Sequence, residues 1–189
     1  MTWEERIKHY CQVTGYPRSM FAMEGGMVIG MWKMGNNYQV KSGYYGGYPA
    51  TYLARVKALF PDKSSVLHLF SGRVDLDVMP GDTVDMNADL KPDYLDDAQT
   101  LTRVPLSLYD IVLCDPPYSV EDAEHYSTSM VKRNLVMRAL TGVDPGTHIV
   151  WLDQVLPMYR KADWAIEAHI GMVKSTNHRY RVITIFCKK

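Results

Sequence analysis

The chain has 189 residues, and its 21 Lys and Arg balance 21 Asp and Glu, so the formal net charge is zero. The length suits one domain with a sizeable core, and the composition is typical of a soluble globular protein. The zero net charge argues against a strong nonspecific grip on nucleic acid. No apolar run approaches the length of a membrane span, and the N-terminus lacks a charged-then-apolar signal pattern, so we predict no membrane contact.

The three cysteines, Cys11, Cys114 and Cys187, show neither disulfide nor metal-ligand spacing, and we predict no metal site. Cys114 and Cys187 lie in apolar runs, where cysteine is usually a small buried side chain. Unpaired cysteines indicate a reducing, cytoplasmic setting.

Charge is unevenly distributed along the sequence. Residues 1–60 carry 7 Lys and Arg against 3 Asp and Glu, residues 61–125 carry 4 against 14, and residues 126–189 carry 10 against 4. The three segments therefore have net charges of +4, −10 and +6. An acidic middle between basic flanks fits a cationic cofactor bound centrally and a polyanion bound by the ends. The alternative is that these charges mix evenly over the folded surface.

The first elements are a helix and a strand. Apolar spacing predicts a helix over residues 2–13, with Thr2 and Glu5 forming a capping box. Residues 27–32 read as a strand. The segment 34–52 is rich in Gly, Tyr and Asn, which suits either a surface on which bases stack or a packed irregular loop.

A helix and a core strand follow. Pro49 is expected to open a helix over 50–60, with Arg55 and Lys57 pointing outward. Residues 65–70 then form a strand, in which His68 is expected to be a core histidine. The strand ends in Phe70-Ser71-Gly72, where glycine lets the backbone approach a ligand.

The next segment alternates with a period of two and reaches a turn at Pro80-Gly81, so residues 73–82 form either a shortened loop or a hairpin. Residues 83–87 read as the second core strand. Asp85 at its end is our candidate for accepting hydrogen bonds from ribose hydroxyls. Asp89 is the second choice, and Asp75 or Asp77 would serve only in another register.

The most informative stretch is Asp115-Pro116-Pro117-Tyr118, which follows the apolar run 108–114. That run suits a central strand covered on both faces, and the two prolines force the chain out of the sheet. Ligands of open α/β sheets bind at this carboxyl edge.

The remaining chain contains two helices and three strands. We expect helices from Glu121 and over 131–140, and strands at 147–152, 164–173 and 180–187. The basic connector between the last two strands could contact substrate phosphates or be a solvated loop.

The sequence Asp115-Pro116-Pro117-Tyr118, with the strand before it and Ser119 after it, resembles the motif of S-adenosylmethionine-dependent amino methyltransferases that act on adenine N6. Phe70-x-Gly72 is similar to the cofactor loop of that family. The resemblance implies an α/β, Rossmann-like methyltransferase fold with a mostly parallel central sheet and a closing antiparallel hairpin. It also implies that S-adenosyl-L-methionine is the cofactor.

The same resemblance implies roles for further residues. Pro49 lies in a segment similar to the one beside the methionine end of the cofactor, and Asp97 would accept a hydrogen bond from its adenine amine. The cofactor-binding set is then Pro49, Phe70, Ser71, Gly72, Asp85 and Asp97. The sequence departs from the family in two respects: Arg73 replaces the usual second glycine, and the usual crossover helix is hard to find.

The predicted activity is methyl transfer to adenine N6 in DNA. Asp115 and the Pro116 carbonyl would accept the two amine hydrogens, Pro117 would stiffen the loop, and Tyr118 would stack on the base. Residues 1–189 would form one domain, with 1–48 as an extension that contributes to substrate binding. Because no recognition domain is evident, a protein partner could supply specificity. The alternatives are methylation of RNA at adenine N6 or guanine N2, and a non-catalytic nucleic-acid-binding subunit.

Overall fold

A computed structural model describes residues 1–35, 47–117, 130–174 and 180–189. Four predictions lie wholly or largely outside these residues: the stacking surface or packed loop within 34–52, the stacking role of Tyr118, the helix from Glu121, and phosphate contacts by the connector 174–179. In the described part of the chain, no helix combines the length and apolar character needed to cross a membrane.

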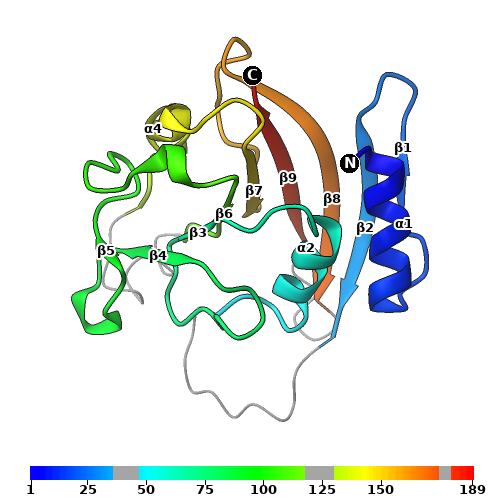
Figure 1. Ribbon diagram of the computed structural model, residues 1–189, viewed down its shortest axis with the longest axis horizontal. Coiled ribbons are helices and arrows are strands. Elements are labelled where there is room, and N and C mark those ends of the chain that lie inside the picture. The colour runs from blue at the N-terminus through cyan, green and yellow to red at the C-terminus, as the bar shows by residue number, and fades with distance from the viewer. Residues whose placement is uncertain (36–46, 118–129, 175–179) are drawn as a thin grey trace.

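The fold is built on one nine-stranded sheet with the order β1-β2-β8-β9-β7-β6-β3-β4-β5 (Figure 1). Its strands are β1 Met20–Ala22, β2 Val28–Met34, β3 Val66–Leu69, β4 Asp82–Asp85, β5 Tyr94–Leu95, β6 Ile111–Cys114, β7 His148–Asp153, β8 Trp164–Lys174 and β9 Tyr180–Lys188.

Five neighbouring strands, β5-β4-β3-β6-β7, are all parallel. Counted from β3 in chain order, they run third, second, first, fourth and fifth, which is the order of the Rossmann fold. β9 lies antiparallel between β7 and β8, so the closing antiparallel hairpin is confirmed. The N-terminal segment extends the sheet beyond this pattern, because β2 pairs in parallel with β8 and β1 forms the edge.

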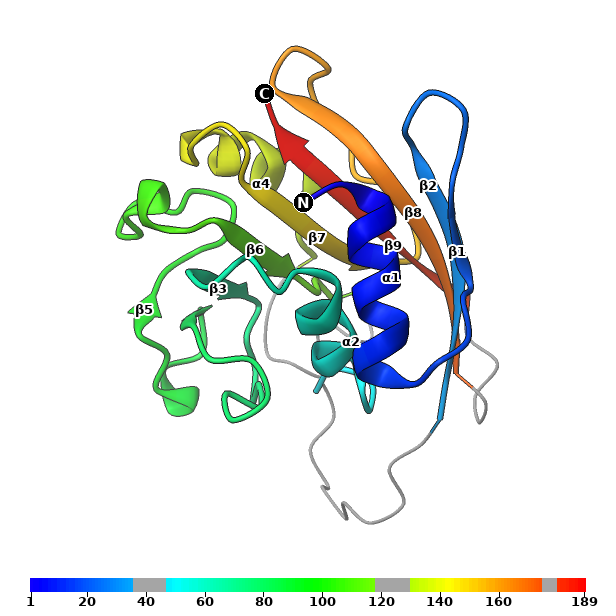
Figure 2. The same cartoon turned by 45° about the vertical axis from the view of Figure 1, so that its right-hand side comes forward.

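Among the described residues, few helices cover this sheet. They are α1 Trp3–Thr14, α2 Tyr52–Leu59 and α4 Arg133–Ala139, with short 3-10 turns at Ala88–Leu90, Leu106–Leu108 and Leu140–Gly142. The α1 and α2 helices lie together near β2 and β8, and α4 lies by β6 and β7 (Figure 2). The predicted capping box of α1 is present, because Thr2 accepts a hydrogen bond from the Glu5 backbone and Glu5 accepts one from Thr2.

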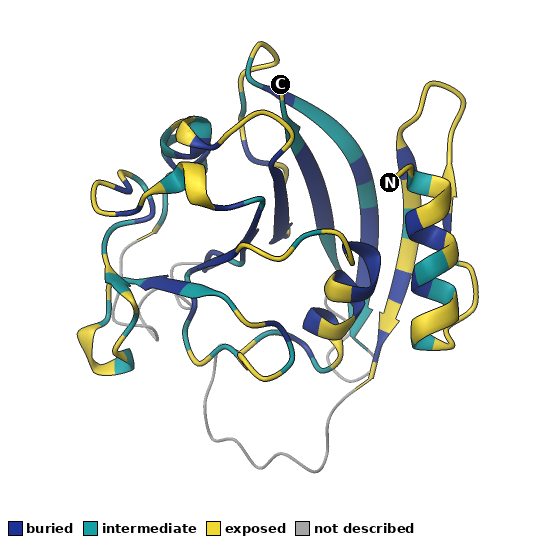
Figure 3. Ribbon diagram, viewed as in Figure 1, coloured by how far each residue is buried: buried dark blue, intermediate teal, exposed yellow. Residues whose placement is uncertain are grey.

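Two hydrophobic clusters flank the sheet, and Figure 3 shows their strands as buried ribbon. β6 is buried throughout and serves both clusters by alternation. Ile111 and Leu113 pack with α1 and α2, whereas Val112 and Cys114 pack with α4. This agrees with a central strand covered on both faces. Because Asp115 comes next in the alternation, it falls on the α2 side.

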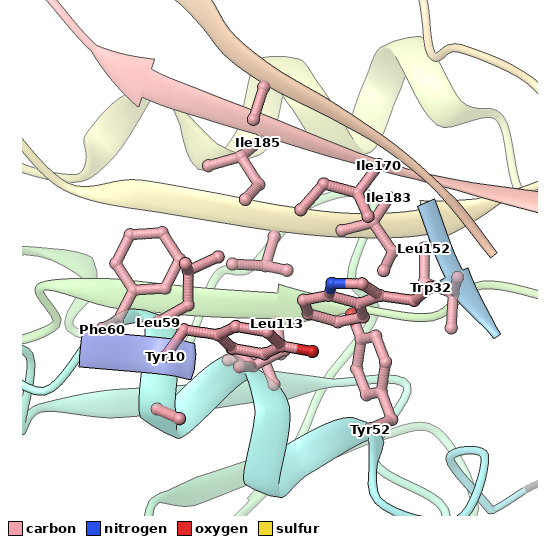
Figure 4. Packing of buried hydrophobic residues seen from close by; sticks show 14 of the residues in the cluster. Tyr10, Trp32, Tyr52, Leu59, Phe60, Leu113, Leu152, Ile170, Ile183 and Ile185 are labelled. Atoms are coloured by element: carbon pink, nitrogen blue, oxygen red, sulfur yellow. The ribbon is translucent and has the colours of Figure 1, made fainter. Parts of the chain in front are cut away.

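One side-chain prediction is wrong: Arg55 is buried, not exposed. Its guanidinium donates to the Tyr10 hydroxyl at 3.1 Å and to the Lys33 carbonyl at 3.1 Å, and it also lies 3.9 Å from the Tyr16 ring centroid. These contacts compensate for burying the charge. Tyr10 in turn stacks on Trp32 with ring centroids 5.6 Å apart (Figure 4), so Arg55 fixes α2 against α1 and β2.

The connection between β3 and β4 contains no helix. It is a loop over residues 70–81 that joins two parallel strands, so the hairpin alternative is wrong and the shortened loop is correct. Gly81 brings this loop back against the start of β3. A Cβ atom at position 81 would lie 2.6 Å from the Val66 carbonyl oxygen and 2.7 Å from the Val66 Cβ.

We therefore expect Gly81→Ala to destabilise the protein by about 1–3 kcal/mol, because the added methyl group would meet backbone that cannot move aside. Urea denaturation followed by tryptophan fluorescence measures this loss. Gly47→Ala is the matched control, since a Cβ at position 47 has nothing within 4 Å. Equal stability of the two variants would contradict the close approach at Gly81.

Candidate functional site

The candidate site lies at the carboxyl edge of the sheet, where β3 and β6 end side by side (Figure 1). Leu69 pairs with Cys114, so Phe70 and Asp115 are the next residues on adjacent strands. The chain leaves β3 toward β4 on one side, whereas it leaves β6 toward β7 on the other. Such a reversal of strand order opens a crevice in which α/β proteins bind ligands. We call the carboxyl ends of the parallel strands β3, β4, β5 and β6 the central edge.

The loop after β3 has a constrained backbone. Phe70 has φ 56° and Gly72 has φ 52°. A left-handed conformation costs a non-glycine residue about 1–3 kcal/mol and is concentrated at functional sites. The Ser71 amide donates to the Val84 carbonyl at 3.1 Å, and the Gly72 amide donates to the Asp85 carboxylate at 3.0 Å. These bonds hold the loop against β4.

Asp85 ends β4 and is half-buried. One carboxylate oxygen accepts from Gly72, and the other accepts from the Asn87 amide at 2.9 Å. Each oxygen can accept a second hydrogen bond, so the carboxylate can still bind hydroxyl groups. The other candidates, Asp75, Asp77 and Asp89, are exposed.

Asp97 follows β5, at the far side of the central edge. Its carboxylate accepts the Gln99 amide at 2.9 Å and so fixes the turn after β5. The Gln99 side chain then accepts the Lys132 amide at 3.0 Å, just before α4. Through Gln99, Asp97 is therefore linked by hydrogen bonds to Lys132, the residue just before α4.

Two tyrosines lie close enough to Asp115 to feel its charge: Tyr48, just before α2, and Tyr52, the first residue of α2. The rings of Tyr48 and Tyr52 stack with centroids 5.0 Å apart. Pro49, which lies between them in the sequence, is buried. Burial raises the pKa of both phenols well above its usual range, and the Asp115 carboxylate adds to the shift. Both hydroxyl oxygens are buried without a hydrogen-bond partner among the described residues. Leaving such groups unsatisfied costs about 1–3 kcal/mol each.

The two phenols were missed as site residues at the sequence level. Tyr48 stood in a Gly/Tyr-rich run, and Tyr52 matched the apolar face of a helix. Only the packing of α2 against the end of β6 brings them to Asp115. Their unsatisfied hydroxyls are donors that a bound molecule could use.

Two other candidates for chemistry are set back from the site. His68 is fully buried, its imidazole contacts the Met79 carbonyl at 3.0 Å, and burial lowers its pKa, which favours the neutral ring. Cys114 is fully buried on the α4 side. Burial and then Asp115 raise the pKa of this thiol well above its usual range, which disfavours a thiolate nucleophile.

The sheet separates the charged segments of the sequence. β1 and β2 come from the basic residues 1–60, and β7, β8 and β9 come from the basic residues 126–189. The acidic residues 61–125 supply β3, β4, β5 and β6. Because the sheet order keeps these groups apart, the strands do not mix the charges evenly. The central edge is thus acidic, while Lys33, Lys174 and Arg181 lie at the same edge of β2, β8 and β9.

The sequence matches no protein-family model and no curated protein. Among solved structures, the chain is similar to the N-methyltransferase NodS from Bradyrhizobium japonicum WM9, with 12% sequence identity and a TM-score of 0.47. The match covers 73% of this chain and 93% of that chain. This likeness is too distant to assign the chain to a family.

Proposed function

We propose that the protein transfers a methyl group from S-adenosylmethionine to the exocyclic N6 amine of adenine in DNA. The observation that carries this proposal is the position of Asp115-Pro116-Pro117. These residues leave β6 at the reversal of strand order, beside the Phe70–Gly72 loop. A motif that resembles the adenine-N6 methyltransferases thus lies at the edge where this sheet type binds ligands.

The residues of the central edge suit the proposed cofactor. Gly72 presents backbone without a Cβ atom, and Asp85 has acceptor capacity for ribose hydroxyls. Pro49, Phe70, Ser71 and Asp97 complete the proposed binding set. The acidic character of the central edge favours a sulfonium cation, and the bound cofactor would supply an electrophilic methyl group.

The proposed chemistry needs orientation more than a strong base. The lone pair of the adenine amine is delocalised into the ring. Asp115 and the Pro116 carbonyl would accept hydrogen bonds from its two N–H groups and direct the freed lone pair at the methyl group. As the nitrogen–methyl bond formed, the sulfur–methyl bond would break to leave a neutral thioether, and one amine proton would pass to solvent. Pro117 would keep the turn rigid, and Tyr118 would stack on the base. The basic ends of β2, β8 and β9, together with residues 1–48, would hold the nucleic acid backbone.

The direct test uses S-adenosylmethionine labelled in its methyl group. The purified protein is incubated separately with duplex DNA, single-stranded DNA, RNA and protein, and the labelled product is identified after hydrolysis. We expect N6-methyladenine from DNA. Label in RNA would redirect the proposal to RNA. If no acceptor is labelled and titration with the cofactor releases no heat, the proposal of a methyltransferase is wrong.

Asp85→Ala is expected to weaken cofactor binding about tenfold to a hundredfold. A hydrogen bond to a charged group contributes about 1.5–3 kcal/mol, and each 1.4 kcal/mol is tenfold in Kd. Isothermal titration with S-adenosylmethionine measures the change. Asp89→Ala is the matched control, because Asp89 is an exposed aspartate of the following turn. Unchanged affinity of Asp85→Ala would contradict the ribose role.

A further inference from the structure

A second polar cluster lies at the other end of the strands from the central edge and takes no part in the proposed methyl transfer. It consists of His148, Glu167 and Cys187, from β7, β8 and β9. One ligand atom from each residue lies within 4.8 Å of the other two. His148 pairs with Ile111, the first residue of β6, whereas Asp115 follows the last. Four residues of strand, roughly 13 Å, therefore separate the cluster from the central edge.

The backbone brings these three side chains to one face. His148 and Cys187 are cross-strand partners of an antiparallel pair, so their side chains point the same way. Glu167 comes from an irregularity in β8 between Ile166 and Ala168, where the register with β9 shifts by one residue. Such bulges insert a residue and redirect its side chain, and they are frequent next to functional sites.

The side chains are held but not fully satisfied. The His148 imidazole contacts the Glu167 carboxylate at 3.0 Å, and the Trp3 indole donates to the same oxygen at 3.0 Å. His148 is 7% exposed, and its Nδ1 has no hydrogen-bond partner in the described part of the chain. The ring nitrogen that faces Glu167 is Nε2, so Nε2 is the atom of His148 that would bind a cation in this cluster.

We propose that His148, Glu167 and Cys187 bind one zinc ion, with the fourth position left to water. Imidazole, carboxylate and thiolate are the ligand types that zinc prefers, and three protein ligands with one open position is a known zinc arrangement. In a tetrahedral site, ligand atoms lie about 3.3–3.8 Å apart.

Charge also favours the ion. On binding, Cys187 releases its proton to solvent, so Glu167 and the thiolate together neutralise Zn²⁺. Arg6 and Lys63, whose charges act on Cys187, are engaged elsewhere: Arg6 pairs with Asp62, and Lys63 donates to the Gly146 carbonyl at 3.1 Å. Trp3 would orient the Glu167 ligand from outside the coordination sphere, as outer hydrogen-bond partners do at metal sites. The ion would tie together β7, β8 and β9.

The experiment titrates the metal-free full-length protein with Co²⁺ and then with Zn²⁺, without cofactor or nucleic acid. We expect saturation at one Co²⁺ per chain, a near-ultraviolet thiolate-to-cobalt absorption band, and displacement by Zn²⁺. Cys187→Ser should abolish the band, and His148→Gln should weaken binding at least about tenfold. Cys11→Ser, which changes another partly buried cysteine, should behave like the wild-type chain.

Several results would overturn the site. These are no saturable binding, a band that persists in Cys187→Ser, or a band that is lost in Cys11→Ser. Circular dichroism of each metal-free variant checks that it folds. If Cys187→Ser does not fold, Glu167→Gln replaces it, and an unchanged affinity of that variant for Co²⁺ would overturn the site. Because the readout involves no methyl transfer, failure of the zinc site leaves the proposed function untouched, and the converse also holds.

Discussion

Asp115→Ala should lower the rate of methyl transfer at least about a hundredfold while leaving the affinity for S-adenosylmethionine nearly unchanged. The carboxylate is proposed to act on the target amine, and removing one such preorganised group typically costs a factor of about 10²–10³. The proposed cofactor contacts come from other residues, namely Pro49 before α2 and residues at the ends of β3, β4 and β5. Single-turnover rates with labelled cofactor, together with calorimetric titration, separate the two effects.

Asp77→Ala is the matched control for this experiment, because Asp77 is an exposed carboxylate in the loop between β3 and β4. It should retain the wild-type rate and affinity. If Asp115→Ala keeps its activity, the motif at the end of β6 is not the catalytic one. If instead it loses cofactor binding and activity together, Asp115 belongs to the cofactor site.

Asp153→Ala should destabilise the fold by about 3–5 kcal/mol. Asp153 is fully buried at the end of β7, where it accepts two hydrogen bonds from Arg133, one from the Trp151 indole at 3.1 Å and one from the Gln154 amide. Arg133 is only 18% exposed, so its charge would lose this partner in a mostly buried position. Removing one member of a buried ion pair has a cost of this order. Urea denaturation measures the free energy of unfolding.

The surface pair of Arg18 with Glu4 provides the comparison. Its side chains are 47% and 57% exposed, so Glu4→Ala should cost less than about 1 kcal/mol. A similar small loss for Asp153→Ala would show that Arg133 finds another partner or reaches water. The buried pair also fixes the first residue of α4, where the chain returns toward the central edge.

Most of the sheet could be predicted from the sequence. The β6 run of Ile, Val, Leu and Cys is buried on both faces, so its uniform apolar pattern was a direct consequence of its place in the sheet. The capping box of α1 was equally readable, because both partners lie within one turn. The period-two segment after Gly72 was ambiguous, since the same pattern suits a hairpin and the loop that the structure contains.

The features that the sequence did not reveal depend on distant contacts. Arg55 is buried beside Tyr10 and Lys33, which accept hydrogen bonds from its guanidinium and lie 45 and 22 residues away along the chain. The unsatisfied phenols of Tyr48 and Tyr52 become visible only when α2 packs by Asp115. The His148, Glu167 and Cys187 cluster has no motif spacing, because three strands and a bulge bring it together.

The pairing of β2 with β8 bears on how the chain folds. Val28 pairs with Ala168 and Met34 pairs with Lys174, so each partner lies 140 residues further along the sequence. During synthesis from the N-terminus, β2 must wait until β8 has been made. Contacts of such long range slow folding, and unpaired strands in the interval are prone to aggregate. An early association of α1 with α2, which are close in sequence, would protect β2 during this delay.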